Sequence, residues 1–119
     1  MRCALTIAAA LIASTGTMAA PTEFPVALRG VWAETPITCE LVRNRSIGPA
    51  PSPSWIIIGR EAVEGTTSAT FKASRGLRAA VARYIDAPDI AIIFELKPSG
   101  FLEETVEGAR ASMSYVRCP

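Results

Sequence analysis

Short apolar runs separated by turn-forming residues dominate the pattern of this 119-residue chain. Trp55-Ile56-Ile57-Ile58 and Ile90-Ala91-Ile92-Ile93-Phe94 are too short for helices and rich in residues that favour strands. Gly59-Arg60-Glu61 and Pro98-Ser99-Gly100 have the composition of tight turns, which predicts hairpins. The strands predicted on these grounds are Val26–Ala33, Trp55–Ile58, Ala62–Val63, Thr66–Ala73, Asp89–Lys97, Phe101–Glu107 and Arg110–Cys118.

Residues 77–86 fit two patterns. Leu77, Ala80, Val81, Tyr84 and Ile85 have the spacing of an amphipathic helix. As a strand, the segment would place Leu77, Ala79, Val81 and Ile85 on one face, with Arg83 as the misfit. Because strands and tight turns surround it, we favour a strand and leave the helix as the alternative.

The predicted fold is all-β, with six to eight short antiparallel strands in a small barrel or a strongly curled sheet. Gly48–Pro53 is predicted to be an irregular loop, because its prolines alternate with other residues. A chain of this length predicts one domain, residues 20–119.

Residues 1–19 are typical of a secretory signal peptide. Arg2 supplies a positive charge, Ala4–Ala13 is an apolar run, and small residues follow up to Ala19. The apolar run is about half as long as a membrane-spanning helix requires. We therefore predict cleavage after Ala19, with Ala20 as the alternative, and a periplasmic or secreted protein with no transmembrane segment after cleavage.

Cleavage changes how the three cysteines are interpreted, because Cys3 leaves with the leader. Cys39 and Cys118 remain as a single pair, and an exported pair is expected to form a disulfide. Free or intermolecular thiols are the alternative.

Loss of Arg2 also leaves eleven basic and eleven acidic residues, so the mature charge is close to zero. Nucleic-acid binders carry a strong basic excess, which argues against that class of partner. The charges are nevertheless unevenly distributed along the chain. A basic group comprises Lys72, Arg75, Arg78 and Arg83, and an acidic group comprises Glu103, Glu104 and Glu107. The two groups are either two solvated faces of opposite charge or an electrostatically polarised docking surface.

The sequence lacks the residues of common catalytic sites. It contains no histidine, which removes the most frequent general base and most zinc sites. Two carboxylates would suffice for a glycosidase, but neighbouring strand residues point to opposite faces. We therefore expect a solvated structural role for Glu103, Glu104 and Glu107, no catalytic residues, no cofactor and no metal.

Trp32 and Trp55 each lie in or beside an apolar strand. Core packing is the expected role for both rings. A partly exposed tryptophan at the mouth of a barrel is the functional alternative.

Gly30-Val31-Trp32-Ala33, Cys39 and the closing Tyr115-Val116-Arg117-Cys118-Pro119 occur together in this chain. This combination resembles a set of small exported proteins of Gram-negative bacteria, in which such segments bracket an all-β domain. Those proteins carry no assigned activity. The resemblance therefore implies a fold and a location. Only the segments at the two ends of the mature chain match specifically.

The same start, with Gly30, Trp32 and then Cys39, is also similar to small lipocalin-like barrels that inhibit secreted metalloproteases. This chain departs from them because its second cysteine lies at the end and Pro21–Pro25 lacks a serine-rich arm. We expect a non-enzymatic cell-envelope protein that binds or masks a protein or small-molecule partner. A protease or lysozyme inhibitor with a lipocalin-like barrel is the alternative.

Overall fold

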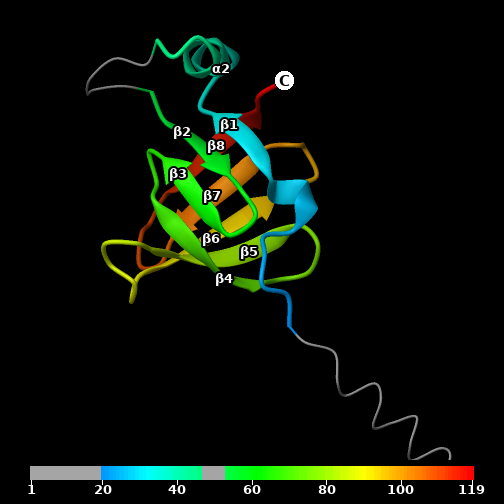
Figure 1. Cartoon of the computed structure of the whole chain (residues 1–119), viewed down its shortest axis with the longest axis vertical. Helices are drawn as coiled ribbons and strands as arrows, with labels where there is room; N and C mark the ends of the chain where they lie inside the picture. Colours follow the sequence, from blue (N-terminus) through cyan, green and yellow to red (C-terminus); the bar gives the residue numbers. More distant parts are fainter. Residues whose placement is uncertain (1–19, 47–52) are drawn as a thin grey trace, which may run out of the picture.

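Eight antiparallel strands follow one another around a closed barrel (Figure 1). The computed structural model describes residues 20–46 and 53–119. Each strand pairs with the next, and β1 pairs with β8 to close the barrel. The predicted fold class is confirmed, in its barrel form. The strands are β1 (Gly30–Ala33), β2 (Trp55–Ile58), β3 (Ala62–Gly65), β4 (Ala69–Ser74), β5 (Ala79–Tyr84), β6 (Ala91–Leu96), β7 (Leu102–Val106) and β8 (Ser112–Arg117).

Alternate residues of each strand point into the barrel and fill it. These inward side chains are mostly aliphatic and aromatic, with alanines on β4 and β5, so large and small groups interlock in a narrow space. The buried interior comprises Trp32, Ile56, Ile58, Val63, Ala69, Ala80, Ala82, Ile92, Phe94, Leu102 and Tyr115.

The strand prediction for residues 77–86 is confirmed as β5. The face that enters the barrel, however, is Ala80 and Ala82, not the apolar series that includes Leu77 and Ala79. Small inward residues leave room for the larger rings of neighbouring strands. Leu77 lies in the turn before β5 and is exposed.

A 3-10 turn, η1 (Val26–Leu28), closes one end of the barrel. Phe24 and Leu28 are fully buried there, and the Phe24 ring lies edge-on to Phe71, with 5.1 Å between ring centroids. We call this the plugged end; it also carries the β2–β3, β4–β5 and β6–β7 turns. The opposite loop end carries the β3–β4, β5–β6 and β7–β8 connections.

The prediction of a strand over Val26–Ala33 is therefore wrong in its first half. Only Gly30–Ala33 is strand, because the preceding residues turn so that Leu28 enters the barrel end. Two backbone bonds stabilise this turn, from Leu28 N–H to the Pro25 carbonyl and from Arg29 N–H to the Val26 carbonyl.

One helix, α2 (Pro36–Arg43), lies outside the barrel beside β1 (Figure 1). No helix was among the elements predicted from the sequence for this stretch. Its signals are local: Pro36 occupies the first turn, and the Thr35 hydroxyl caps the helix by accepting a hydrogen bond from Thr38 N–H.

The disulfide between Cys39 and Cys118 is confirmed, and it spans 79 residues of sequence. Cys39 belongs to α2, and Cys118 follows β8 and donates its backbone N–H to the Val31 carbonyl of β1. The bond therefore attaches the helix to the seam where the first and last strands meet.

The predicted leader, residues 1–19, lies outside the described residues, as does the predicted Gly48–Pro53 loop except for Pro53. Within the described part, no helix has the length and apolar character required to cross a membrane.

Candidate binding surface

The hollows that the structure shows lie on the outside of the barrel, not in its filled interior. One of them, about 430 Å³, lies at the plugged end. The segment 20–26 and Arg29 form one wall, and Ser74, Gly76 and Leu77 of the β4–β5 turn form the other.

The wall formed by the N-terminal segment is held in place by both backbone and side chains. Phe24 N–H donates to the Arg60 carbonyl at 2.7 Å while its ring plugs the barrel. The Glu23 carboxylate pairs with Arg60 at 2.7 Å and with Arg29 at 3.5 Å. This segment is therefore part of the folded end and does not form a free arm.

Opposite this wall, the β4–β5 turn presents Leu77 to solvent between two arginines, Arg75 and Arg78. The leucine side chain is 83% exposed, the highest value among the exposed large apolar residues. Arg75 N–H closes the turn by bonding to the Ala79 carbonyl, and Gly76 supplies the positive φ of 76° that the turn needs. Within the described residues, neither Arg75 nor Arg78 makes an ion pair.

Arg78 joins this turn to the neighbouring β6–β7 turn. Its guanidinium donates to the carbonyls of Leu96, at 3.3 Å, and Lys97, at 3.1 Å. The β6–β7 turn exposes Phe101, and η1 exposes Val26 beside the hollow. We define the turn face as these five residues: Val26, Arg75, Leu77, Arg78 and Phe101.

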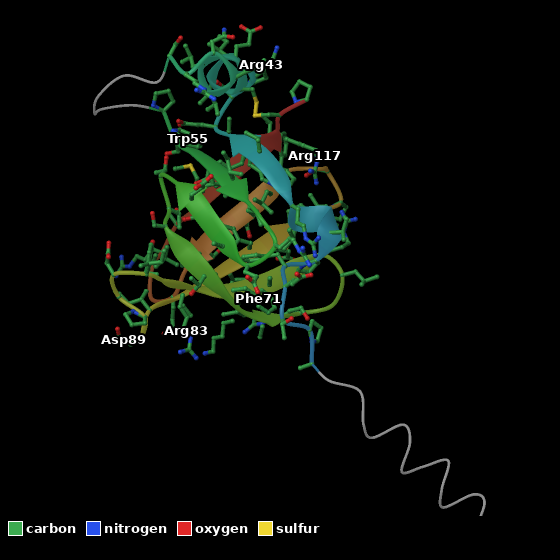
Figure 2. The ribbon with its side chains drawn as sticks, viewed as in Figure 1. Arg43, Trp55, Phe71, Arg83, Asp89 and Arg117 are labelled. Carbon is green, nitrogen blue, oxygen red and sulfur yellow. A yellow bond between two sulfur atoms is a disulfide. The ribbon has the colours of Figure 1, made fainter. Side chains whose placement is uncertain are left out.

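The basic group found in the sequence is divided by the fold. Arg75 and Arg78 flank the β4–β5 turn, and Lys72 lies close to that turn where a bulge interrupts β4. Arg83 pairs with Thr70 toward the loop end. Figure 2 shows Arg83 near Asp89, on the side of the barrel away from Arg117.

The acidic group is divided as well. Glu103 lies on the outer face and pairs with Lys97 at 3.5 Å, and Glu107 is exposed after β7. Glu95 also bonds to Lys97, at 3.1 Å; this hydrogen bond and the charge of Glu103 raise the pKa of Lys97. The expected solvated role is wrong for Glu104, which points into the barrel and is buried.

Glu104 is bound inside the barrel by two hydroxyl groups. Thr67 Oγ1 donates to its Oε2 and the Tyr115 hydroxyl to its Oε1, each at 2.9 Å. Burial, followed by the negative charge of Glu104, raises the pKa of Tyr115 far above its ordinary value. The same two causes raise the pKa of Tyr84. These contacts bind β7 to β8 and to the β3–β4 connection.

The two segments on which the first resemblance rests, Gly30–Ala33 and Tyr115–Pro119, contact each other through Trp32 and Arg117. The Arg117 guanidinium lies 4.2 Å from the centre of the Trp32 ring and donates to the carbonyls of Arg29, at 2.9 Å, and Ala27, at 2.6 Å. The indole Nε1–H donates to the Leu28 carbonyl at 2.9 Å. These contacts attach η1 to β1 and β8, the two strands that close the barrel.

The expectation for the two tryptophans is confirmed for Trp32, which is fully buried. It is wrong for Trp55, which begins β2 on the outward face and is half-buried (Figure 2). Ile56 and Ile58 take the inward positions of that strand instead.

No protein family, curated protein or solved structure matches this chain. In the ranges 20–46 and 53–119, no three histidine, cysteine or acidic residues gather where they could hold a metal ion. Sequence analysis missed Val26, Leu77 and Phe101; the turn-forming Ser74-Arg75-Gly76 before Leu77 was the signal that could have placed that leucine in a turn.

Proposed function

We propose that this chain is a non-enzymatic exported protein that binds a partner in the cell envelope through its turn face. The observation that carries the proposal is Leu77, exposed between Arg75 and Arg78. Exposed apolar groups gathered at one place are typical of interaction sites. Cations without acidic neighbours attract an oppositely charged partner.

The chemistry of the surface defines the partner as anionic and partly apolar. Arg75 offers a planar guanidinium group that suits phosphate and carboxylate oxygens. Arg78 adds a second positive charge beside it, while its Nε–H and Nη2–H donate to the Leu96 and Lys97 carbonyls. Leu77 and Phe101 offer apolar contact beside them. The filled interior supports a surface partner over a small molecule carried inside the barrel.

Association with isolated Gram-negative envelope fragments tests this proposal. The exported, processed protein is expected to sediment with the fragments, and Leu77→Ser is expected to release most of it. Ile85→Ser is the matched control, because Ile85 is also exposed but lies after β5 at the loop end. Equal binding by both variants, or no binding by the unaltered protein, would contradict the proposal.

Inhibition of a secreted protease or lysozyme is the second candidate function, and the protruding β4–β5 turn favours it. A turn that presents Leu77 beyond the barrel could enter an active-site cleft. Inhibition by insertion of the N-terminal segment into an active site is disfavoured, because Phe24 is buried in the barrel end. A panel of secreted proteases and lysozymes tests this function, and submicromolar inhibition that Leu77→Ser abolishes would support it over envelope binding.

A further inference from the structure

We infer that the partner of the turn face is the surface of a bilayer that contains anionic phospholipids. This inference rests on the proposed function and names its partner class. The protein would lie on the membrane, with the tips of a few side chains entering the boundary between headgroups and acyl chains.

The apolar groups of the turn face are arranged for a deformable apolar phase. Leu77 and Val26 flank the hollow at the plugged end, and Phe101 projects from the next turn. Arg78 holds the β4–β5 and β6–β7 turns together through its bonds to Leu96 and Lys97. Three separate protruding groups suit a laterally uniform layer better than they suit one shaped pocket.

The charges at the plugged end favour an anionic layer. Arg75 and Arg78 are exposed and make no ion pair with any described residue. Most acids at this end are already neutralised by basic partners, with Glu61 and Glu64, which line a hollow at the β2–β3 turn, as the exceptions. The paired acids are Glu23 with Arg29 and Arg60, and Glu95 and Glu103 with Lys97.

The loop end provides an internal contrast. The β5–β6 connection also exposes large apolar residues, Ile85 and Ile90. There, however, the exposed residues between them include the acids Asp86 and Asp89. An anionic membrane would repel this connection and attract the β4–β5 turn, so charge selects between two ends that are both partly apolar.

The position of the N-terminal segment also favours the plugged end as the end that faces the membrane. Ala20, the first described residue, lines the hollow at the plugged end. The predicted leader, residues 1–19, therefore joins the barrel at the turn face. An apolar leader anchored in a membrane would place this face next to the bilayer.

Vesicle sedimentation tests the inference. The exported, processed protein is mixed with vesicles of phosphatidylcholine alone or with an equal share of phosphatidylglycerol. We expect binding to the mixed vesicles only, weakened by added salt because exposed charges are screened. Arg75→Gln is expected to weaken binding about fivefold, and Leu77→Ser about tenfold or more.

Arg83→Gln and Ile85→Ser are the matched controls, because each removes the same kind of group away from the turn face. Both are expected to bind like the unaltered protein. All four substituted side chains are exposed, so thermal unfolding should show that each variant is folded.

Equal binding to neutral vesicles, no binding to either kind, or an equal loss in the controls would overturn the lipid assignment. If the protein does not bind vesicles but its binding to envelope fragments still depends on Leu77, the partner is another anionic envelope component and the proposed function stands. If neither vesicles nor fragments bind, both proposals are wrong.

Discussion

The hydroxyl of Tyr115 donates a hydrogen bond of 2.9 Å to Oε1 of Glu104 inside the barrel. Thr67 donates to the other carboxylate oxygen, so each oxygen has one donor. A buried carboxylate is tolerated only where hydrogen bonds replace the water it has lost. The hydrogen bond from Tyr115 therefore offsets part of the cost of burying the Glu104 carboxylate and connects β7 to β8.

Tyr115→Phe should lower the free energy of unfolding by about 1.5 to 3 kcal/mol, because it leaves a buried carboxylate with one donor fewer. Tyr84→Phe is the matched control. Within the described residues the Tyr84 hydroxyl makes no hydrogen bond, so its removal should cost about 0.5 kcal/mol or less. Urea denaturation measures both values, and equal costs would show that the bond to Glu104 contributes nothing.

Alkaline pH should destabilise the protein through its two tyrosines, Tyr84 and Tyr115. Burial and Glu104 raise the pKa of each phenol in the folded state. In the unfolded chain both lose a proton near pH 10, so above about pH 10 the native state holds more protons than the unfolded state. Stability is then constant with respect to these groups below pH 10 and falls as pH rises further.

The ultraviolet absorbance of tyrosinate measures this effect directly. The native protein should show little tyrosinate at a pH where the urea-denatured chain is half ionised. Native phenols that titrate together with those of the denatured chain would contradict the burial of Tyr115 beside Glu104.

The disulfide between Cys39 and Cys118 should be a main support of stability. Closing a loop of about 80 residues stabilises the fold by about 4 to 4.5 kcal/mol in the chain-entropy description. Replacing both cysteines with serine should lower the unfolding free energy by an amount of that order. Mass spectrometry of the unreduced protein should show a mass two hydrogen atoms below that of the dithiol form, and full alkylation without reductant would disprove the bond.

Gly65→Ala should be much more damaging than Gly100→Ala. Both glycines have positive φ, 113° and 93°, so each substitution strains the backbone by about 1 to 2 kcal/mol. At Gly65 the new Cβ would also lie 2.5 Å from the Trp55 carbonyl oxygen, whereas nothing lies within 4 Å at Gly100. Thermal unfolding compares the two, and equal midpoints would show that β2 can move away from β3.

Much of the barrel could be predicted from local pattern. Ile56 and Ile58 alternate with outward residues, and Gly59-Arg60-Glu61 turns the chain, so the first hairpin can be recognised from a few residues. The cap of α2 was equally local but was missed, because Thr35 and Pro36 begin a helix in a stretch that lacks a long apolar stripe. The candidate surface was less predictable, because it combines three turns that are distant in sequence.

The sequence by itself determined the strand pattern, the cysteine pair and the run of basic residues around Leu77, because these depend on neighbouring residues and on spacing. Only the tertiary structure decided which face each strand turns inward. It placed Glu104 against Tyr115, stacked Arg117 on Trp32, and separated Arg83 from Arg75. Such relationships depend on how eight strands close into one barrel, and no short window of sequence contains that information.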